Sequence, residues 1–142
     1  KTASGLDRMF LALISNCLKD EGLEDGSERT VLSLPPALAP VKAANLPLVK
    51  KDGLPEFAEK IFNDLKYDFN VISEEKDSIG KRYRRQDAIG TPFCITVDHD
   101  SLADGTVTLR ERDTMKQERV KVEDLRRIID EKVNFRTLLS KI

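Results

Sequence analysis

Three short apolar segments alternate with two helical patterns between residues 41 and 97, and this order limits the fold more than any other feature. Apolar residues from Leu54 to Leu65 recur at the i, i+3, i+4, i+7 spacing of one helix face. Residues 93–97 form a near-continuous apolar run, which is typical of a strand covered on both faces. Short connections in such an order predict parallel strands with helices on the sheet faces. The predicted strands are 41–48, 69–73 and 93–97, and the predicted helices are 54–65 and 78–89.

The C-terminal third departs from this repeat. Residues 106–110 alternate between polar and apolar, and 115–120 is their predicted antiparallel partner across a turn near residue 113. A final amphipathic helix is expected over 122–133, followed by a short apolar tail. The sequence therefore predicts an α/β fold in which a mixed five-stranded sheet is flanked by three helices.

The first 40 residues lie outside this pattern. The apolar run Met9–Ile14 would point all round a helix, which predicts a helix buried on every side. It is either a core helix of this domain or, as we favour, a truncated helix of a larger protein whose remaining part covers it. Residues 19–29 carry a net charge of −3 and two glycines, which predicts a solvated loop. Three prolines within 34–40 predict a stiff extended connector and a domain boundary near residue 38.

Composition excludes several classes of protein. At 142 residues the chain is about one domain long, and no apolar run approaches the roughly 18 residues of a membrane span. The N-terminus lacks the charged and apolar regions of a signal peptide. Cys17 and Cys94 are lone thiols without CxxC spacing, which argues against structural zinc and favours a reducing, cytoplasmic location. Because the net charge is −1, any nucleic-acid site must be local.

The common phosphate-loop, nucleophile-elbow and zinc-protease motifs do not occur in the sequence. On a strand, Asp98 and Asp100 would share one face and His99 the other, so we expect a solvated strand end and no metal site. Cys94 lies in an apolar strand and is expected to be a core residue. The strongest polar feature is the cationic run 81–85, which places three cations on one helix face. It is either a solvated face with ion pairs or a polyanion site, since guanidinium groups pair well with phosphate.

The segment Asp77–Phe93 resembles the signature stretch of the anticodon-binding domain shared by the glycyl, threonyl, prolyl and histidyl class II aminoacyl-tRNA synthetases. Thr108–Gln117 is similar to the glycyl branch in particular. Gly5–Arg8 resembles the start of the third class II motif, and Leu34–Pro40 resembles the junction between the catalytic and anticodon-binding domains.

This resemblance implies two parts, a catalytic-domain remnant with linker over 1–37 and an anticodon-binding domain over 38–142. The implied partner is tRNA, held by its anticodon stem-loop, with no DNA and no membrane partner. The parent enzyme would join glycine to its tRNA using ATP with Mg, as a homodimer formed through its catalytic domain. This fragment alone would carry no catalytic residue, bind no cofactor and be inactive.

The resemblance also implies the residues of each site. The remnant of the ATP site would be Gly5, Leu6, Asp7 and Arg8, and the weaker amino-acid site would be a strand end comprising Thr2, Ala3, Ser4 and Gly5. The phosphate contacts would be Lys81, Arg82, Arg84 and Arg85. The residues that read bases would be Arg110, Arg112, Gln117 and Glu118.

Two alternatives from other classes remain open. The domain is a non-catalytic accessory or protein-interaction module if it binds RNA only weakly and retains a protein partner. It is a small-molecule α/β enzyme if a ligand occupies the crevice at the strand C-termini. The lack of a phosphate loop, a nucleophile or a second well-placed acid disfavours the enzyme.

Overall fold

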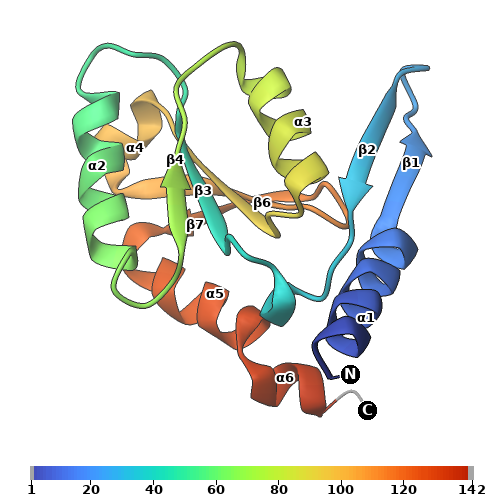
Figure 1. Ribbon diagram of the computed structural model, residues 1–142. Coiled ribbons are helices and arrows are strands. Elements are labelled where there is room, and N and C mark those ends of the chain that lie inside the picture. The colour runs from blue at the N-terminus through green and yellow to red at the C-terminus, as the bar shows by residue number, and fades with distance from the viewer. Residues whose placement is uncertain (1, 141–142) are drawn as a thin grey trace.

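Five strands form one mixed sheet in the order β4-β3-β5-β6-β7 in the computed structural model, which describes residues 2–140 (Figure 1). β3 runs parallel to β4 and β5, whereas β6 is antiparallel to both β5 and β7. The predicted mixed five-stranded sheet is therefore confirmed. The strands are β3 (Ala43–Pro47), β4 (Val71–Ser73), β5 (Phe93–Val97), β6 (Thr106–Glu111) and β7 (Gln117–Lys121).

Three helices cover the sheet, as predicted. Helices α2 (Leu54–Leu65) and α5 (Leu125–Val133) pack on one face, and α3 (Ile79–Ile89) packs on the other. Every residue of β3 and β5 is buried because these central strands are covered on both sides. The larger core cluster lies under α2 and α5, while Ala44, Leu46 and Cys94 form the smaller cluster under α3.

Some boundaries differ from the prediction. β7 begins at Gln117 because Met115 adopts a left-handed conformation (φ 58°) in the turn before it. A 3-10 turn (Val122–Asp124) precedes α5, and the predicted apolar tail forms a further short helix, α6 (Phe135–Leu139). The predicted strand end at 98–100 is wrong, because Asp98 caps a helix, α4 (His99–Asp104), by accepting from the Ser101 amide.

The loop predicted for residues 19–29 is also wrong. Two strands, β1 (Leu18–Gly22) and β2 (Glu28–Leu32), pair as an antiparallel hairpin. Arg29 and Val31 are buried on alternate positions of β2, and β2 packs against α3. The connector expected to be extended contains a 3-10 turn (Pro36–Leu38).

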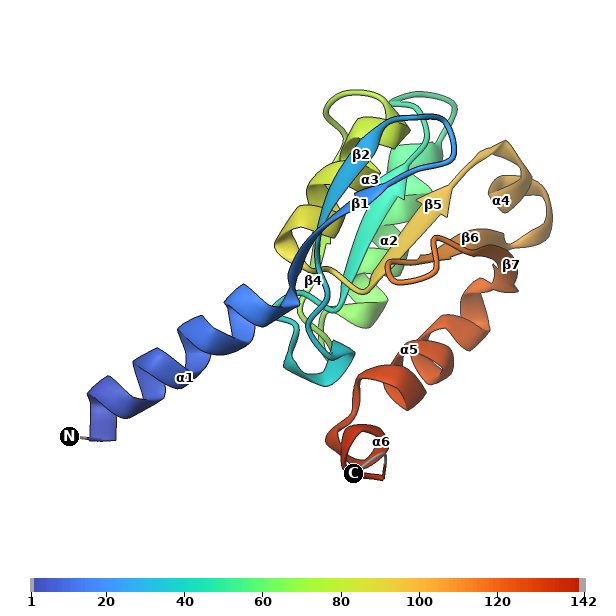
Figure 2. The same ribbon diagram turned by 90° about the vertical axis from the view of Figure 1, so that its right-hand side faces the viewer.

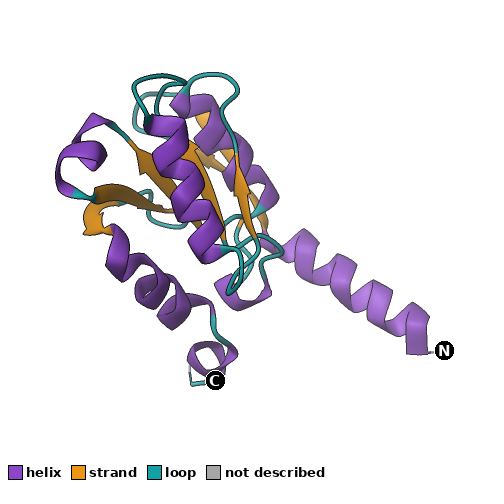
Figure 3. Ribbon diagram, turned by 90° about the vertical axis from the view of Figure 1, so that its left-hand side faces the viewer, coloured by secondary structure: helices purple, strands orange, loops and turns teal. Residues whose placement is uncertain are grey.

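Helix α1 (Thr2–Cys17) extends away from the sheet (Figures 2 and 3). Its residues Met9 and Leu11 are 70% and 65% exposed, so in this chain the helix is not buried on every side. The strand end expected at Thr2–Gly5 is instead part of this helix. No helix within residues 2–140 is long and apolar enough to cross a membrane.

Candidate nucleic-acid interface

Some side chains of the cationic run on α3 are exposed, and others are held in contacts within the protein. Lys81 is exposed, and Arg84 is partly exposed with its guanidinium 3.9 Å from the Asp87 carboxylate. Arg85 pairs with Asp77 at 2.7 Å and with Glu74. This pairing holds the pKa of the Asp77 carboxyl below its ordinary value. Lys81 and Arg84 are thus less tightly paired within the protein than Arg85 is.

Arg82 is a buried residue that joins α3 to the sheet. It is 2% exposed and donates to the carbonyl oxygens of Pro47 (2.7 Å), Leu48 (3.2 Å) and Glu74 (3.1 Å). Burial lowers the pKa of its guanidinium, with Glu74 partly opposing the shift. Its contacts are with main-chain oxygens of the protein, which makes a direct phosphate contact by Arg82 a poor fit to the structure.

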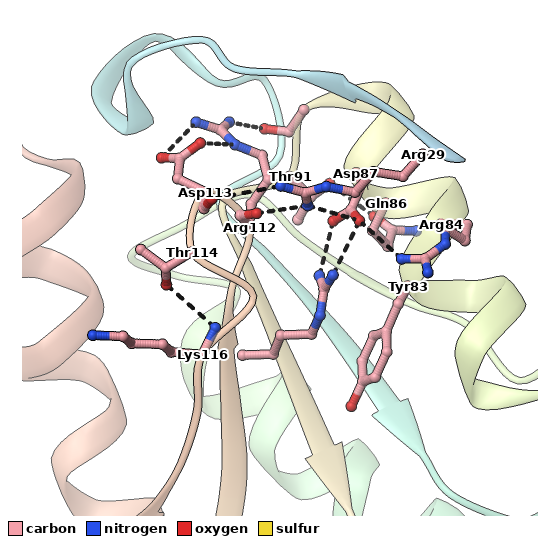
Figure 4. A network of polar contacts seen from close by, with 12 residues as sticks. Arg29, Tyr83, Arg84, Gln86, Asp87, Thr91, Arg112, Asp113, Thr114 and Lys116 are labelled. Carbon is pink, nitrogen blue, oxygen red and sulfur yellow. Dashed lines mark hydrogen bonds and ion pairs between the residues drawn. The ribbon is translucent and has the colours of Figure 1, made fainter. Parts of the chain in front are cut away.

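Asp87 is the centre of a buried ion-pair cluster and lies beside Arg29 (Figure 4). Arg110 belongs to this cluster. It donates two hydrogen bonds to the Asp87 carboxylate, at 2.8 and 3.0 Å, and its guanidinium lies 4.7 Å from the centre of the Tyr83 ring. Burial disfavours the charged guanidinium, but the hydrogen bonds to Asp87 and the attraction of its negative charge, with smaller contributions from neighbouring groups, together outweigh this cost and raise the pKa of Arg110. Arg29 of β2 completes the cluster, 3.1 Å from the same carboxylate.

Arg112 is 1% exposed and begins the turn that joins β6 to β7. Its guanidinium donates to the carbonyl oxygens of Gly90 (2.8 Å) and Leu34 (2.5 Å) and to the Asp113 carboxylate (3.0 and 3.2 Å). Arg110 and Arg112, both expected to read bases, are therefore buried and hold protein groups in place.

Glu118 and Gln117, by contrast, are exposed and border a cleft of about 350 Å³ between the sheet and α5. Glu118 stands opposite Leu109 in the strand register, so its side chain shares the sheet face that α5 covers. The apolar floor of this β6–β7 cleft lies beside two lysines. The cleft is lined by Phe93, Leu109, Glu111, Lys116, Gln117, Glu118, Ile128 and Lys132.

The two predicted sets of RNA-contacting residues meet only at Asp87, which both Arg84 and Arg110 approach. The α3 cations are on one face of the sheet, and the β6–β7 cleft is on the face covered by α5. Sequence reasoning did not single out Phe93 or Lys132 for the cleft, nor Asp87 for the cluster. Asp87 lies within the stretch that carries the family resemblance and is surrounded by arginines, which was the available signal.

The expected ATP remnant and amino-acid residues lie on α1. Gly5 and Arg8 are exposed there. Helix α1 projects away from the sheet (Figure 2). Four residues on one projecting helix do not enclose a nucleotide, so the described chain does not fit ATP by itself. The expected ATP and amino-acid contacts of five further residues concern side chains that lie outside the described part of the structure. These residues are Thr2, Ala3, Ser4, Leu6 and Asp7.

The other chemically active side chains have structural surroundings. No group of three or more metal-ligating side chains gathers anywhere in the described part of the chain. Cys94 is buried, and burial raises the pKa of its thiol to about 12. A thiol that stays protonated is a poor nucleophile, in agreement with the core role expected from its strand.

Comparison with known proteins identifies the family of this domain. The model of the family described as "Anticodon binding domain" matches residues 42–132, which include the sheet, its three covering helices and the β6–β7 cleft. The chain belongs to this anticodon-binding domain family.

Among curated relatives it is 53% identical over 125 residues to a glycine–tRNA ligase of Borrelia hermsii and 54% identical over 135 residues to that of Clostridium perfringens. The matches cover 88% and 92% of this chain but only 28% of either relative.

Solved structures share the fold at lower sequence identity. The RNA binding domain of threonyl-tRNA synthetase from Cryptosporidium parvum superimposes with a TM-score of 0.64 at 24% identity, over 70% of this chain and 25% of that one. Prolyl-tRNA synthetase from the same organism, complexed with L-proline and AMP, gives 0.66 at 16% identity, over 86% and 34%. These similarities confirm the class II anticodon-binding domain fold. The boundary near residue 38 stays a prediction.

Proposed function

We propose that this chain is the anticodon-binding part of a glycine–tRNA ligase and that it holds the anticodon stem-loop of the matching tRNA. The observation that carries the proposal is the β6–β7 cleft, which lies inside the family match and presents the Glu118 carboxylate above an apolar floor. Proteins read unpaired RNA bases in this way, by hydrogen bonds to base edges and by stacking.

The exposure of each side chain determines whether we assign it a base contact, a phosphate contact or a structural role. Glu118 is exposed at the cleft and reads base edges, whereas Lys116 and Lys132 at its border contact the loop phosphates. Gln117 stands opposite Arg110 in the strand register, so its side chain lies on the other face of the sheet. Arg112 holds the turn from inside and Arg110 holds Asp87 of α3, so neither side chain is placed to contact the bases. Lys81 and Arg84 lie on the opposite face and become phosphate contacts only if the stem reaches α3.

The longer protein implied by the relatives would use ATP with Mg to attach glycine to tRNA, as a cytoplasmic homodimer formed through its catalytic domain. This chain would supply tRNA selection and none of the activation chemistry. Supplied with glycine and ATP, it should give no pyrophosphate exchange above background.

Titration with two RNA stem-loops tests the proposal. One carries the glycine anticodon and the other has those bases replaced, and fluorescence anisotropy gives both dissociation constants. The wild-type chain should bind the matched loop more tightly than the mismatched one. Glu118→Gln should reduce the ratio of these two affinities by about ten-fold, since one good base contact is worth about 1–3 kcal/mol. Glu123→Gln is the matched control, because Glu123 is exposed outside the cleft. Equal binding of both loops by the wild type would contradict the proposal and favour an interaction module.

A further inference from the structure

Arg29 connects three parts of the chain that are far apart in sequence. From β2 it donates to Glu21 of β1 (2.7 and 2.9 Å) and to Asp87 of α3 (3.1 Å). The same guanidinium donates to the carbonyl oxygen of Arg112 at 2.8 Å and approaches that of Asp113 at 3.5 Å. Arg29 is 2% exposed, and its contacts with Asp87 and the Arg112 carbonyl oxygen are buried, whereas the Glu21 carboxylate is partly exposed.

The carbonyl groups that Arg29 contacts belong to the β6–β7 turn (residues 112–116), which borders the cleft. Lys116 at the end of this turn lines the β6–β7 cleft, and Asp113 lines a smaller adjoining pocket that shares Phe93, Glu111 and Lys132 with it. The turn also carries a left-handed residue, Met115 (φ 58°), a conformation that non-glycine residues adopt at a cost. The geometry of the turn therefore depends on outside support.

Two contacts at the end of β2 hold the hairpin in place. At the end of β2, the Ser33 amide donates to the Cys17 carbonyl oxygen at the end of α1, at 2.8 Å. Near it, Gly90 closes α3 at φ +84°, and a Cβ built there would lie 3.0 Å from the Leu32 carbonyl oxygen. The hairpin thus sits against the end of α3 with no space for a side chain between them.

We propose that Arg29 is a positioning residue for anticodon recognition, which fixes the β6–β7 turn from the hairpin and thereby sets the shape of the β6–β7 cleft. This inference rests on the proposed function of that cleft. Arg29 does not touch the RNA. Because coupling between two sites is reciprocal, the matched stem-loop should in turn stabilise the hairpin.

Arg29→Lys tests the proposal with little loss of buried charge. Lysine keeps a cation near Asp87. It lacks the planar guanidinium, which contacts two carboxylates and two carbonyl oxygens at the same time. The matched-to-mismatched affinity ratio should fall at least about five-fold, the lower end of typical coupling between sites. Amide hydrogen exchange at Glu111, which donates to the Lys116 carbonyl oxygen across the turn, should accelerate without any RNA present.

Thr30→Ala is the matched control, because Thr30 lies on the same strand, is exposed and bonds only to Asp20 of β1. It should leave both the ratio and the Glu111 exchange unchanged. If Arg29→Lys weakens binding of both stem-loops equally and keeps the ratio, Arg29 is only structural and the proposal fails. If the wild-type chain itself does not discriminate, the proposed function fails first, and this inference fails with it.

A measurement on the wild type avoids dependence on a variant that folds poorly. Exchange of the β2 amides is followed with the matched stem-loop, with the mismatched one and without RNA. The matched stem-loop should slow exchange in β2 more than the mismatched one does. Equal β2 exchange in all three samples, with discrimination intact in the binding assay, would overturn the role of Arg29 and leave the proposed function standing.

Discussion

Asp87→Asn should be the most destabilising conservative substitution in the Asp87 cluster. The carboxylate is fully buried and accepts from Arg110 at 2.8 and 3.0 Å and from Arg29 at 3.1 Å. Asparagine preserves the shape but removes the charge and turns one acceptor into a donor facing a guanidinium. Removing one partner of a buried ion pair costs about 3–5 kcal/mol, because the other charges stay buried without compensation. At about 2–4 °C per kcal/mol for a chain near this size, the melting temperature should fall by about 6–20 °C.

Urea unfolding followed by circular dichroism measures this loss, with linear extrapolation of the free energy of unfolding to water. Asp64→Asn is the control, since Asp64 pairs with Arg126 on the surface. Exposed pairs contribute at most about 1 kcal/mol, so the control should stay within that limit. A loss below about 1 kcal/mol for Asp87→Asn would show that the two arginines are not held by this carboxylate, and the assignment of Arg110 as a support would be refuted.

Three further predictions follow from the contacts described. Lys116→Ala should weaken matched and mismatched stem-loops alike and reduce the salt-dependence slope of binding by about 0.7, because a phosphate contact carries no sequence information; a changed affinity ratio would contradict this. Asp98→Ala should cost about 1 kcal/mol in urea unfolding at neutral pH through loss of the α4 cap. Because Arg119 and the cap hold the pKa of Asp98 below its ordinary 3.8, this contribution is present above pH 3.8 and should disappear as the pH falls through the lowered value. A thiol reagent should modify Cys17 in the folded chain and both cysteines only in denaturant, as mass spectrometry would show, because Cys94 is buried with its pKa raised to about 12.

The sheet was predictable because its elements carry strong local patterns. The helical spacing of 54–65 and the apolar run of 93–97 each define an element without help from the rest of the chain. The hairpin at 18–32 was not predictable in the same way. Its acidic composition resembles a loop, and what stabilises it is burial of Arg29 and Val31 against α3, a contact between residues far apart in sequence.

The candidate site shows the same limit. A run of arginines indicates polyanion binding only if the guanidiniums are free, and sequence does not reveal which of them are buried. Arg82 and Arg112 donate to carbonyl oxygens more than 20 residues away in sequence, and Arg110 donates to Asp87 of α3. That Glu118 contacts RNA stays a prediction, but its exposure follows from its place on β7, an edge strand whose residues are mostly exposed.

The most direct test of the central claim, that the anticodon bases enter the β6–β7 cleft, is an NMR titration of the wild-type chain with the matched stem-loop. We predict that the largest shifts fall on Glu111, Lys116, Gln117, Glu118 and Lys132, and that the mismatched stem-loop moves these signals less. Shifts confined to Lys81 and Arg84 on α3, with the cleft signals unmoved, would contradict the account and place the RNA on the opposite face of the sheet.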